Sequence, residues 1–244
     1  MNIYAFIPAR YQSTRFPGKP LARIAGKPMI QHVYERASSC RQLSKVYVAT
    51  DDERISDCVH EFGGRVVITE KQHRSGTDRI CEAAQKAGLA EEDLVVNIQG
   101  DQPAFHPSVV TQLIKPLIED GSINMTTLRY KFTDKSDAQN PNSVKVVTDS
   151  QGFALYFSRY PIPFFRDIES KGVAYYKHLG FYGFRMSLLV RFTGLPEGIL
   201  ESAEKLEQLR LLENGFKIKV LESPFDSVEV DVPEDVKNVE EMLR

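Results

Sequence analysis

Strand-like and helix-like segments alternate through the first half of the chain, and this alternation most limits the possible fold. Short apolar runs predict buried strands, and each is followed by a segment with apolar residues at helical spacing. In chain order these segments cover 2–9, 30–37, 45–51, 52–62, 65–70, 78–87, 93–101 and 110–118. Repeated βα units predict an α/β fold with a largely parallel, Rossmann-like sheet flanked by helices. Ligands then bind at the carboxyl ends of the strands.

The pattern changes after Asn142, where strand follows strand. Three strand candidates, "SVKVVTD", "FALYFSR" and "LGFYGFR", predict an antiparallel excursion at about 143–190, whose aromatic residues suit a subunit interface. A helix follows over 201–215 and a strand over 217–222, then a short strand that ends at Asp231 and a proline-started helix. No linker interrupts the pattern, so we expect a single domain over 1–244.

Composition excludes several classes of function. Lys plus Arg total 31 against 33 Asp plus Glu, and this net charge of −2 provides no general attraction to nucleic acid or to an anionic membrane. Cys40, Cys58 and Cys81 lack CxxC spacing and are typical of reduced thiols. The first apolar run is too short to span a membrane and lacks the pattern of a signal peptide. We therefore expect a cytoplasmic protein.

A basic loop follows the first strand, in "IPARYQSTRFPGKPL". Backbone N–H groups near Gly18 can approach an anion while Arg10, Arg15 and Lys19 neutralise a polyphosphate. The alternative is a solvated basic loop that its prolines make rigid. The motifs GxxxxGK[ST] and GxGxxG are missing, which argues against a P-loop kinase and a dinucleotide-dependent dehydrogenase.

Two aspartates at predicted strand ends are candidate metal ligands. Asp101 follows the apolar run "LVVNI", and Asp231 ends "SVEVD". Mg²⁺ prefers carboxylate and triphosphate oxygens, so both positions suit it. The alternatives are a turn residue for Asp101 and a helix cap for either aspartate.

Three further segments carry polar groups. Ser75, Gly76 and neighbouring N–H groups in "HRSGTDR" can hydrogen-bond a nucleobase edge, although a helix cap explains the same residues. Arg159 in "SRY" suits a substrate carboxylate. His178 in "YKHLGFYGF" is by default a hydrogen-bonded structural histidine.

The order of these segments is more specific than any one of them. "PARYQSTRFPGKPL", "VATDDERI", "SGTDR", "NIQGDQP", "ALYFSR", "HLGFYGF" and "AEKLEQLRLLENG" follow one another along nearly the whole chain. Together they closely resemble the 3-deoxy-manno-octulosonate (Kdo) cytidylyltransferases, also called CMP-Kdo synthetases.

The resemblance implies a nucleotide-diphospho-sugar transferase fold and a Mg²⁺-dependent reaction of CTP with an acidic eight-carbon sugar. The products are the CMP-sugar, used for lipopolysaccharide assembly, and pyrophosphate. No protein nucleophile is required, which agrees with the lack of a convincing Ser/His/Asp or Cys/His arrangement. The implied catalytic residues are Arg10, Lys19 and Asp101, and the implied metal ligands are Asp101 and Asp231. The implied CTP site comprises Arg10, Ser13, Arg15, Lys19, Ser75, Gly76, Arg79 and Gln99. The implied sugar site comprises Arg159, His178, Tyr182, Glu207 and Gln208.

Two residues depart from the Kdo pattern, beside the expected metal ligands. Kdo enzymes have Glu after "QGD" where this chain has Gln102, and Gly-Val-Asp in the tail where this chain has Glu229 before Val230 and Asp231. Both residues resemble a branch that uses 8-amino-3,8-dideoxy-manno-octulosonate, and Glu229 could attract its ammonium group. An ordinary solvent-facing glutamate on a strand would explain Glu229 equally well. Kdo therefore remains the substrate that we expect first.

The sequence also allows two other classes of protein. A glycosyltransferase with a similar α/β domain would typically present a DxD pair, which this chain lacks at a strand end. A non-catalytic regulator would bind CTP without turnover. We further expect a homodimer, since the family resemblance and the aromatic excursion both favour it.

Overall fold

One twisted sheet organises the molecule, in a computed structural model that describes residues 1–13, 15–73, 75–166 and 174–243. Strands β1, β4, β5 and β6 are mutually parallel, β7 and β11 form a second parallel pair, and β10 lies antiparallel between β6 and β7. In spatial order the strands are β11 (Lys219–Glu222), β7 (Met125–Lys131), β10 (Tyr176–Arg185), β6 (Leu94–Asn97), β1 (Ile3–Ala9), β4 (Lys45–Thr50) and β5 (Val66–Ile68). The predicted α/β class with a largely parallel sheet is confirmed.

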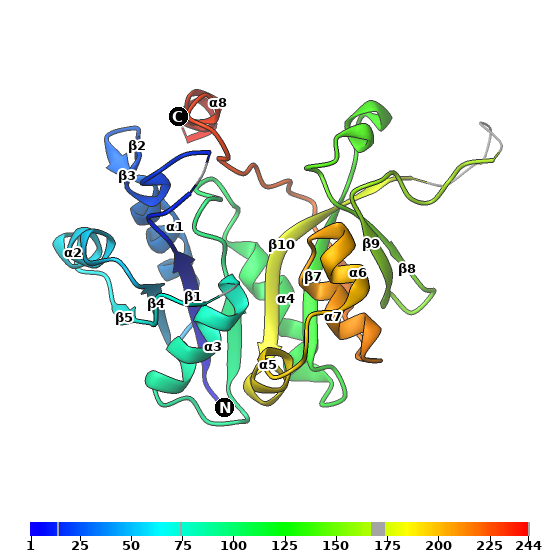
Figure 1. The fold of residues 1–244 in the computed structure, drawn as a ribbon, viewed down its shortest axis with the longest axis horizontal. Coiled ribbons are helices and arrows are strands. Elements are labelled where there is room, and N and C mark those ends of the chain that lie inside the picture. Colours follow the sequence, from blue (N-terminus) through cyan, green and yellow to red (C-terminus); the bar gives the residue numbers. More distant parts are fainter. Residues whose placement is uncertain (14, 74, 167–173, 244) are drawn as a thin grey trace.

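Helices cover both faces of this sheet because successive residues of each strand point to opposite sides. Val96 of β6 packs with the helices of one face, and Val95 packs with those of the other. The first face carries α1 (Met29–Ser38), α2 (Glu53–Glu61) and α4 (Ser108–Glu119). The second face carries α3 (Gly76–Lys86), α5 (Met186–Thr193) and α7 (Gln208–Glu213). Figure 1 shows the helices arranged around the sheet.

The excursion is antiparallel, as predicted. Strands β8 (Lys145–Thr148) and β9 (Ala154–Ser158) pair with each other, and β8 joins the sheet through β10. They project from the sheet beside the upper end of β10 (Figure 1). Part of the predicted excursion, 167–173, lies outside the described residues.

Two predicted elements are wrong. The expected continuous helix over 201–215 is instead α6 (Ile199–Glu204) and α7, because Lys205 adopts a left-handed conformation with φ 53° and ends α6. The expected short strand before Asp231 is extended chain without ladder pairing, since its polar groups bond to loops instead. The final helix, α8 (Asp235–Leu243), begins two residues after Pro233.

The segment 223–234 between β11 and α8, here called the crossing segment, runs over the top of the molecule from the β7 side to α8, above the end of β1 (Figure 1). Along this crossing the Ser223 N–H donates to the Arg129 carbonyl of β7, and the Val230 N–H donates to the Asp101 carbonyl after β6, each at 2.8 to 2.9 Å. At its far end α8 packs on the small hairpin of β2 (Arg23–Ile24) and β3 (Lys27–Pro28). Two short 3-10 helices, η1 (Lys19–Leu21) and η2 (Lys135–Gln139), complete the described elements. No helix in the described part of the chain has the length and apolar character needed to cross a membrane.

Candidate active site

The basic loop between β1 and η1 is held in a closed turn. The Gly18 N–H donates to the Tyr11 carbonyl at 2.9 Å, and Gly18 has a left-handed φ of 71° that favours glycine. The guanidinium of Arg54 lies over the Tyr11 ring, 3.2 Å from its centroid. Arg10 extends toward the loop before α3 and donates to the His73 carbonyl at 2.9 Å. The prolines and these contacts give the cations a defined placement at the end of β1.

The loop after β6 approaches β1 closely at Gly100. A Cβ at this position would lie 2.9 Å from the Pro8 carbonyl oxygen, so only glycine fits without a shift of the backbone. Asp101 follows directly, and its carbonyl accepts the Val230 N–H at 2.9 Å. This bond brings Asp231, which lies 130 positions later in the chain, to the same edge of the sheet.

Lys19 joins the two aspartates. Its Nζ lies 2.6 Å from Asp101 Oδ2 and 3.8 Å from Asp231 Oδ1. Arg15 approaches Asp231 from the other side, with its guanidinium nitrogen 3.1 Å from Oδ2. Ser13 is in the same loop, and its hydroxyl accepts the backbone N–H three residues later at 3.3 Å. The loop and both predicted metal ligands therefore form one cluster of alternating charge.

This cluster fits the expected divalent cation. Both carboxylates are within reach of a single ammonium group, and a hard cation requires the same oxygen ligands. In the described part of the chain no three His, Cys, Asp or Glu side chains gather as a metal site. The two aspartates are thus an incomplete ligand set of the kind that a triphosphate and water complete.

The residues predicted to lie by cytosine and ribose begin α3. Ser75 caps this helix, because its hydroxyl accepts the Asp78 N–H at 3.1 Å, and Gly76 is the first helical residue. Arg79 is buried rather than open to a ligand, with its guanidinium 3.0 Å from Asp51 Oδ1 and 2.5 Å from the Thr69 hydroxyl. Through these contacts Arg79 joins α3 to the residues that follow β4 and β5.

A cavity of about 710 Å³ lies beside the Asp101–Lys19–Asp231 cluster. Four of the five predicted sugar residues line this cavity, and Glu207 does not. Residues of the crossing segment line it as well. The lining includes Arg15, Gln99, Asp101, Arg159, Lys177, His178, Tyr182, Gln208, Glu229 and Asp231. The β6 loop, β10, α7 and the tail therefore meet in this cavity.

Arg159 reaches the cavity wall, but its guanidinium already holds the wall together. It donates to the carbonyls of Pro141, Glu204 and Lys205 at 2.6 to 3.5 Å. Three of its five N–H groups are used in this way, which leaves two for a substrate carboxylate.

The break between α6 and α7 places Gln208 at this cavity, and Glu207 at a smaller neighbouring cavity that Gln208 also lines. Burial raises the pKa of Glu207, and hydrogen bonds from Thr77 and Ser75 at the start of α3 oppose that effect. The Gln208 Nε2 is buried without a hydrogen-bond partner among the described residues, which is unusual for a buried amide nitrogen. Burial also raises the pKa of Tyr182, and the Glu207 and Glu229 charges add to the increase.

Gln102 and Glu229, the two departures from the Kdo pattern, contact each other. The Gln102 Nε2 donates to Glu229 Oε1 at 2.9 Å, and the Gln102 Oε1 accepts the Ser227 hydroxyl at 3.1 Å. Gln102 is fully buried, whereas the Glu229 carboxyl faces the open cavity. Burial and the Asp101 charge raise the pKa of Glu229, whereas the hydrogen bond from Gln102 and the Lys177 charge oppose this increase. Compared with the Kdo pattern, a carboxylate is absent at position 102 after β6 and present at position 229 before α8.

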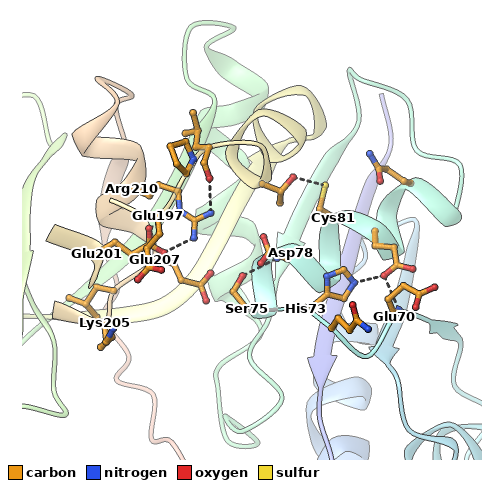
Figure 2. A pocket seen from close by; sticks show the side chains of 17 residues that line it. Glu70, His73, Ser75, Asp78, Cys81, Glu197, Glu201, Lys205, Glu207 and Arg210 are labelled. Carbon is orange, nitrogen blue, oxygen red and sulfur yellow. Dashed lines mark hydrogen bonds and ion pairs between the residues drawn. The ribbon is translucent and has the colours of Figure 1, made fainter. Parts of the chain in front are cut away.

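A second and larger cavity, of about 910 Å³, lies between α3 and the α5 to α7 region. Figure 2 shows Ser75 and Asp78 on one side of it, and Glu201, Glu207 and Arg210 on the other. Arg210 is paired with Glu201 at 2.5 Å. A smaller cavity shares Glu207 with this second cavity and Gln208 with the 710 Å³ cavity, so the three lie next to one another between the start of α3 and the Asp101–Lys19–Asp231 cluster.

The chain belongs to the cytidylyltransferase family: the family model described as "Cytidylyltransferase" matches residues 4–218. Membership defines an enzyme that transfers a cytidylyl group, so the glycosyltransferase and the non-catalytic regulator are set aside. The fold and the strand-end site agree with this class.

Relatives of two named kinds are similar over the full length. A 3-deoxy-manno-octulosonate cytidylyltransferase of Geobacter sulfurreducens (strain ATCC 51573 / DSM 12127 / PCA) is 49% identical over 253 residues, covering 100% of both chains. An 8-amino-3,8-dideoxy-manno-octulosonate cytidylyltransferase of Shewanella sp. (strain ANA-3) is 54% identical over 245 residues, covering 100% of this chain and 99% of the relative. A solved CMP:2-keto-3-deoxy-manno-octonic acid synthetase in complex with CTP superposes with a TM-score of 0.93 at 40% identity, covering 100% of this chain and 98% of the other.

Proposed function

We propose that this protein transfers CMP from CTP to Kdo, forming CMP-Kdo and pyrophosphate. The sugar's anomeric hydroxyl oxygen bonds to the α-phosphorus, the bond between the α-phosphorus and the bridging oxygen breaks, and the hydroxyl proton passes to solvent. The observation that carries the proposal is the meeting of Asp101, Asp231 and Lys19 beside a cavity that holds the sugar-side residues. The similar Kdo enzymes support the choice of sugar.

The residues of this chain supply binding and charge stabilisation rather than a nucleophile. Arg10, Arg15 and Lys19 neutralise the triphosphate and the departing pyrophosphate, with Ser13 in the same loop. Ser75 and Gly76 present the N-terminus of α3 to the cytidine, and Gln99 links that region to the cavity. Arg79 supports this site from behind through its pair with Asp51. Holding both anions in one cleft makes the reaction effectively intramolecular.

Asp101 and Asp231 would hold Mg²⁺, together with oxygens of the triphosphate. Such an ion lowers the cost of charge on the transferring phosphoryl group and eases proton loss from a nearby hydroxyl. In this structure Lys19 pairs with Asp101 and Arg15 pairs with Asp231. The basic loop and a bound Mg²⁺ would therefore contact the same two carboxylates.

The 8-amino analogue is the second candidate substrate. The specific observation in its favour is the cavity-facing carboxylate of Glu229, which Gln102 holds in place. An ammonium group at carbon 8 would find a partner there, whereas a hydroxyl gains less from a charged acceptor. The similar 8-amino enzymes add support.

We also propose that the enzyme works as a homodimer in the cytoplasm and supplies lipopolysaccharide assembly. The dimer is supported by large apolar side chains that are exposed on β9 and just after it, namely Leu155, Tyr160 and Phe164. Cys40, Cys58 and Cys81 are free, as suits a reducing compartment.

The decisive experiment is a pyrophosphate-release assay with purified protein, CTP, Mg²⁺ and each sugar in turn. We expect release with at least one sugar, loss on chelation of the metal, and no release without sugar. Parallel reactions with UTP test the base. If neither sugar supports release above the sugar-free reaction, the proposed function is wrong.

Asp101→Ala should lower kcat by about 100-fold or more, because a bound metal contributes several kcal/mol and about 1.4 kcal/mol is a tenfold change in rate. Thermal unfolding should show that the fold is kept, since the Asp101 carbonyl still accepts the Val230 N–H. Asp57→Ala, on the exposed side of α2, is the matched control and should leave kcat unchanged. Near-normal turnover by Asp101→Ala would reject this residue as a metal ligand.

A further inference from the structure

Strand β10 contains a bulge opposite Thr127 of β7. Its pairing with β7 shifts register between Leu179 and Tyr182, so Gly180 and Phe181 have no direct partners. A bulge frees carbonyl groups from the ladder, and the Thr127 hydroxyl lies 2.8 Å from the Phe181 oxygen and 3.3 Å from the Leu179 oxygen. Thr127 thus stabilises the irregular strand from the neighbouring one.

The same hydroxyl oxygen lies 2.9 Å from Nε2 of His178. A hydroxyl has one proton, and both carbonyls can only accept it. If this proton pointed to Nε2, the Thr127 oxygen would face the Phe181 oxygen at 2.8 Å with no hydrogen between them. We therefore assign the Thr127 proton to a carbonyl, so that the Thr127 oxygen accepts from the ring. This arrangement requires a hydrogen on His178 Nε2.

The imidazole is neutral as well as oriented. His178 is buried, and burial lowers its pKa to about 3. The ring meets Phe157 edge to face, with centroids 4.8 Å apart, and Tyr182 at 5.5 Å. A neutral ring protonated at Nε2 leaves Nδ1 as an acceptor with a free lone pair.

Nδ1 is the polar atom that the ring can offer to the cavity. His178 lines the sugar-side cavity, whereas Thr127 is fully buried and does not line it. Among the described residues Nδ1 has no protein partner, and it is not among the unpartnered atoms that are closed to solvent. The cavity therefore receives an acceptor at this point.

We propose that Thr127 is a positioning residue that fixes His178 in the Nε2–H tautomer, so that Nδ1 accepts a hydrogen bond from a hydroxyl of the bound sugar acid. The sugar half of this assignment rests on the proposed function. His178 then recognises a donor and does not bind the substrate carboxylate. It is also not the general base, because a ring nitrogen with so low a pKa removes protons poorly.

The test compares two variants. Thr127→Val keeps the shape of the side chain but removes its hydroxyl, whereas Thr127→Ser keeps the hydroxyl. Protein labelled with ¹⁵N-histidine reports the tautomer by NMR, and a His178→Gln variant assigns the signal among the 5 histidines. In the unsubstituted protein and in Thr127→Ser we expect Nε2 protonated and Nδ1 bare from pH 6 to 8. Thr127→Val should lose this preference.

Kinetics provide the second readout. A lost neutral hydrogen bond costs about 1 kcal/mol, so Thr127→Val should raise the sugar KM roughly fivefold. Thr127→Ser should restore the sugar KM, and the KM for CTP should stay unchanged in both variants. A general structural defect would instead change both KM values.

The outcomes separate the two levels of the proposal. A proton on Nδ1, or a cationic ring, in the unsubstituted active protein overturns the assignment, even if Thr127→Val fails to fold. An unchanged tautomer and sugar KM in folded Thr127→Val overturns the role of Thr127. Failure of both sugars in the pyrophosphate assay refutes the proposed function and the sugar half, while the NMR result still decides the tautomer.

Discussion

At the scale of single residues, Gln102 and Glu229 show that two separate differences can be one feature. The Gln102 Nε2 lies 2.9 Å from Glu229 Oε1. A glutamate at position 102 would therefore bring a second carboxylate to about the same distance from the Glu229 carboxylate. Like charges this close repel strongly. The amide at 102 therefore makes the acid at 229 tolerable, and Ser227 holds the amide in the orientation that donates to it.

Glu229→Gln should reduce kcat/KM for the 8-amino sugar by about tenfold or more and change kcat/KM for Kdo much less. The reason is that a hydrogen bond to a charged group contributes about 1.5 to 3 kcal/mol. Competition assays with both sugars at equal concentration measure this ratio. Glu234→Gln, exposed on the same tail, is the control. The double variant Gln102→Glu/Glu229→Gly should favour Kdo, and an unchanged ratio in both variants would contradict the role of the pair.

At the scale of elements, Arg79 explains how α3 is fixed against the sheet. Its side chain is 1% exposed and joins the helix to Asp51 after β4 and to Thr69 after β5. Ser75, at the start of the same helix, faces the cleft. The position of the candidate cytidine site thus depends on a buried ion pair behind it.

Asp51→Ala should lower the free energy of unfolding by about 2 to 3 kcal/mol, since it leaves the Arg79 charge buried without its partner. We place the loss at the low end because the Asp51 side chain is still 22% exposed. Urea denaturation measures the change. Lys115→Ala, in the exposed pair with Glu119, is the control and should cost less than about 0.5 kcal/mol. Equal effects of the two substitutions would show that the pair does not anchor α3.

At the scale of the whole molecule, the crossing segment completes the candidate site, and we predict that a second copy binds at β9 and the chain that follows it. The crossing segment carries Glu229 and Asp231 to the edge where β1 and β6 end. Leu155 on β9 is 61% exposed, and Tyr160 and Phe164, which follow β9, are 77% and 85% exposed. Several large, exposed apolar side chains within one stretch of ten residues are typical of an interface.

Leu155→Glu should convert the expected homodimer to a monomer, because a charge at the centre of an apolar interface loses its hydration. Sedimentation velocity over a concentration series should give about twice the chain mass of 27.7 kDa for the unsubstituted protein. Ile118→Glu, on the exposed side of α4, is the control and should remain dimeric. Monomer throughout the series without any substitution would refute the dimer.

Much of the fold could be predicted because its first half repeats local patterns. The strands and helices from β1 to α4 each carry their own apolar periodicity, apart from the small β2–β3 hairpin. Strand β7 was not predicted, since its threonines are buried and satisfied by tertiary partners: Thr126 donates to the Leu113 carbonyl, and Thr127 to the bulge of β10. The break at Lys205 also leaves no clear signal, because lysine is an ordinary helix former.

The sequence by itself determined the class of fold, the family, the basic loop and the two strand-end aspartates, because local periodicity and motif order carry that information. Only the tertiary structure decided that Lys19 joins both aspartates, that Arg79 is buried in an ion pair, and that Gln102 meets Glu229 across 127 positions. These contacts depend on how the chain crosses the sheet edge. No spacing within one segment encodes which loops will meet there.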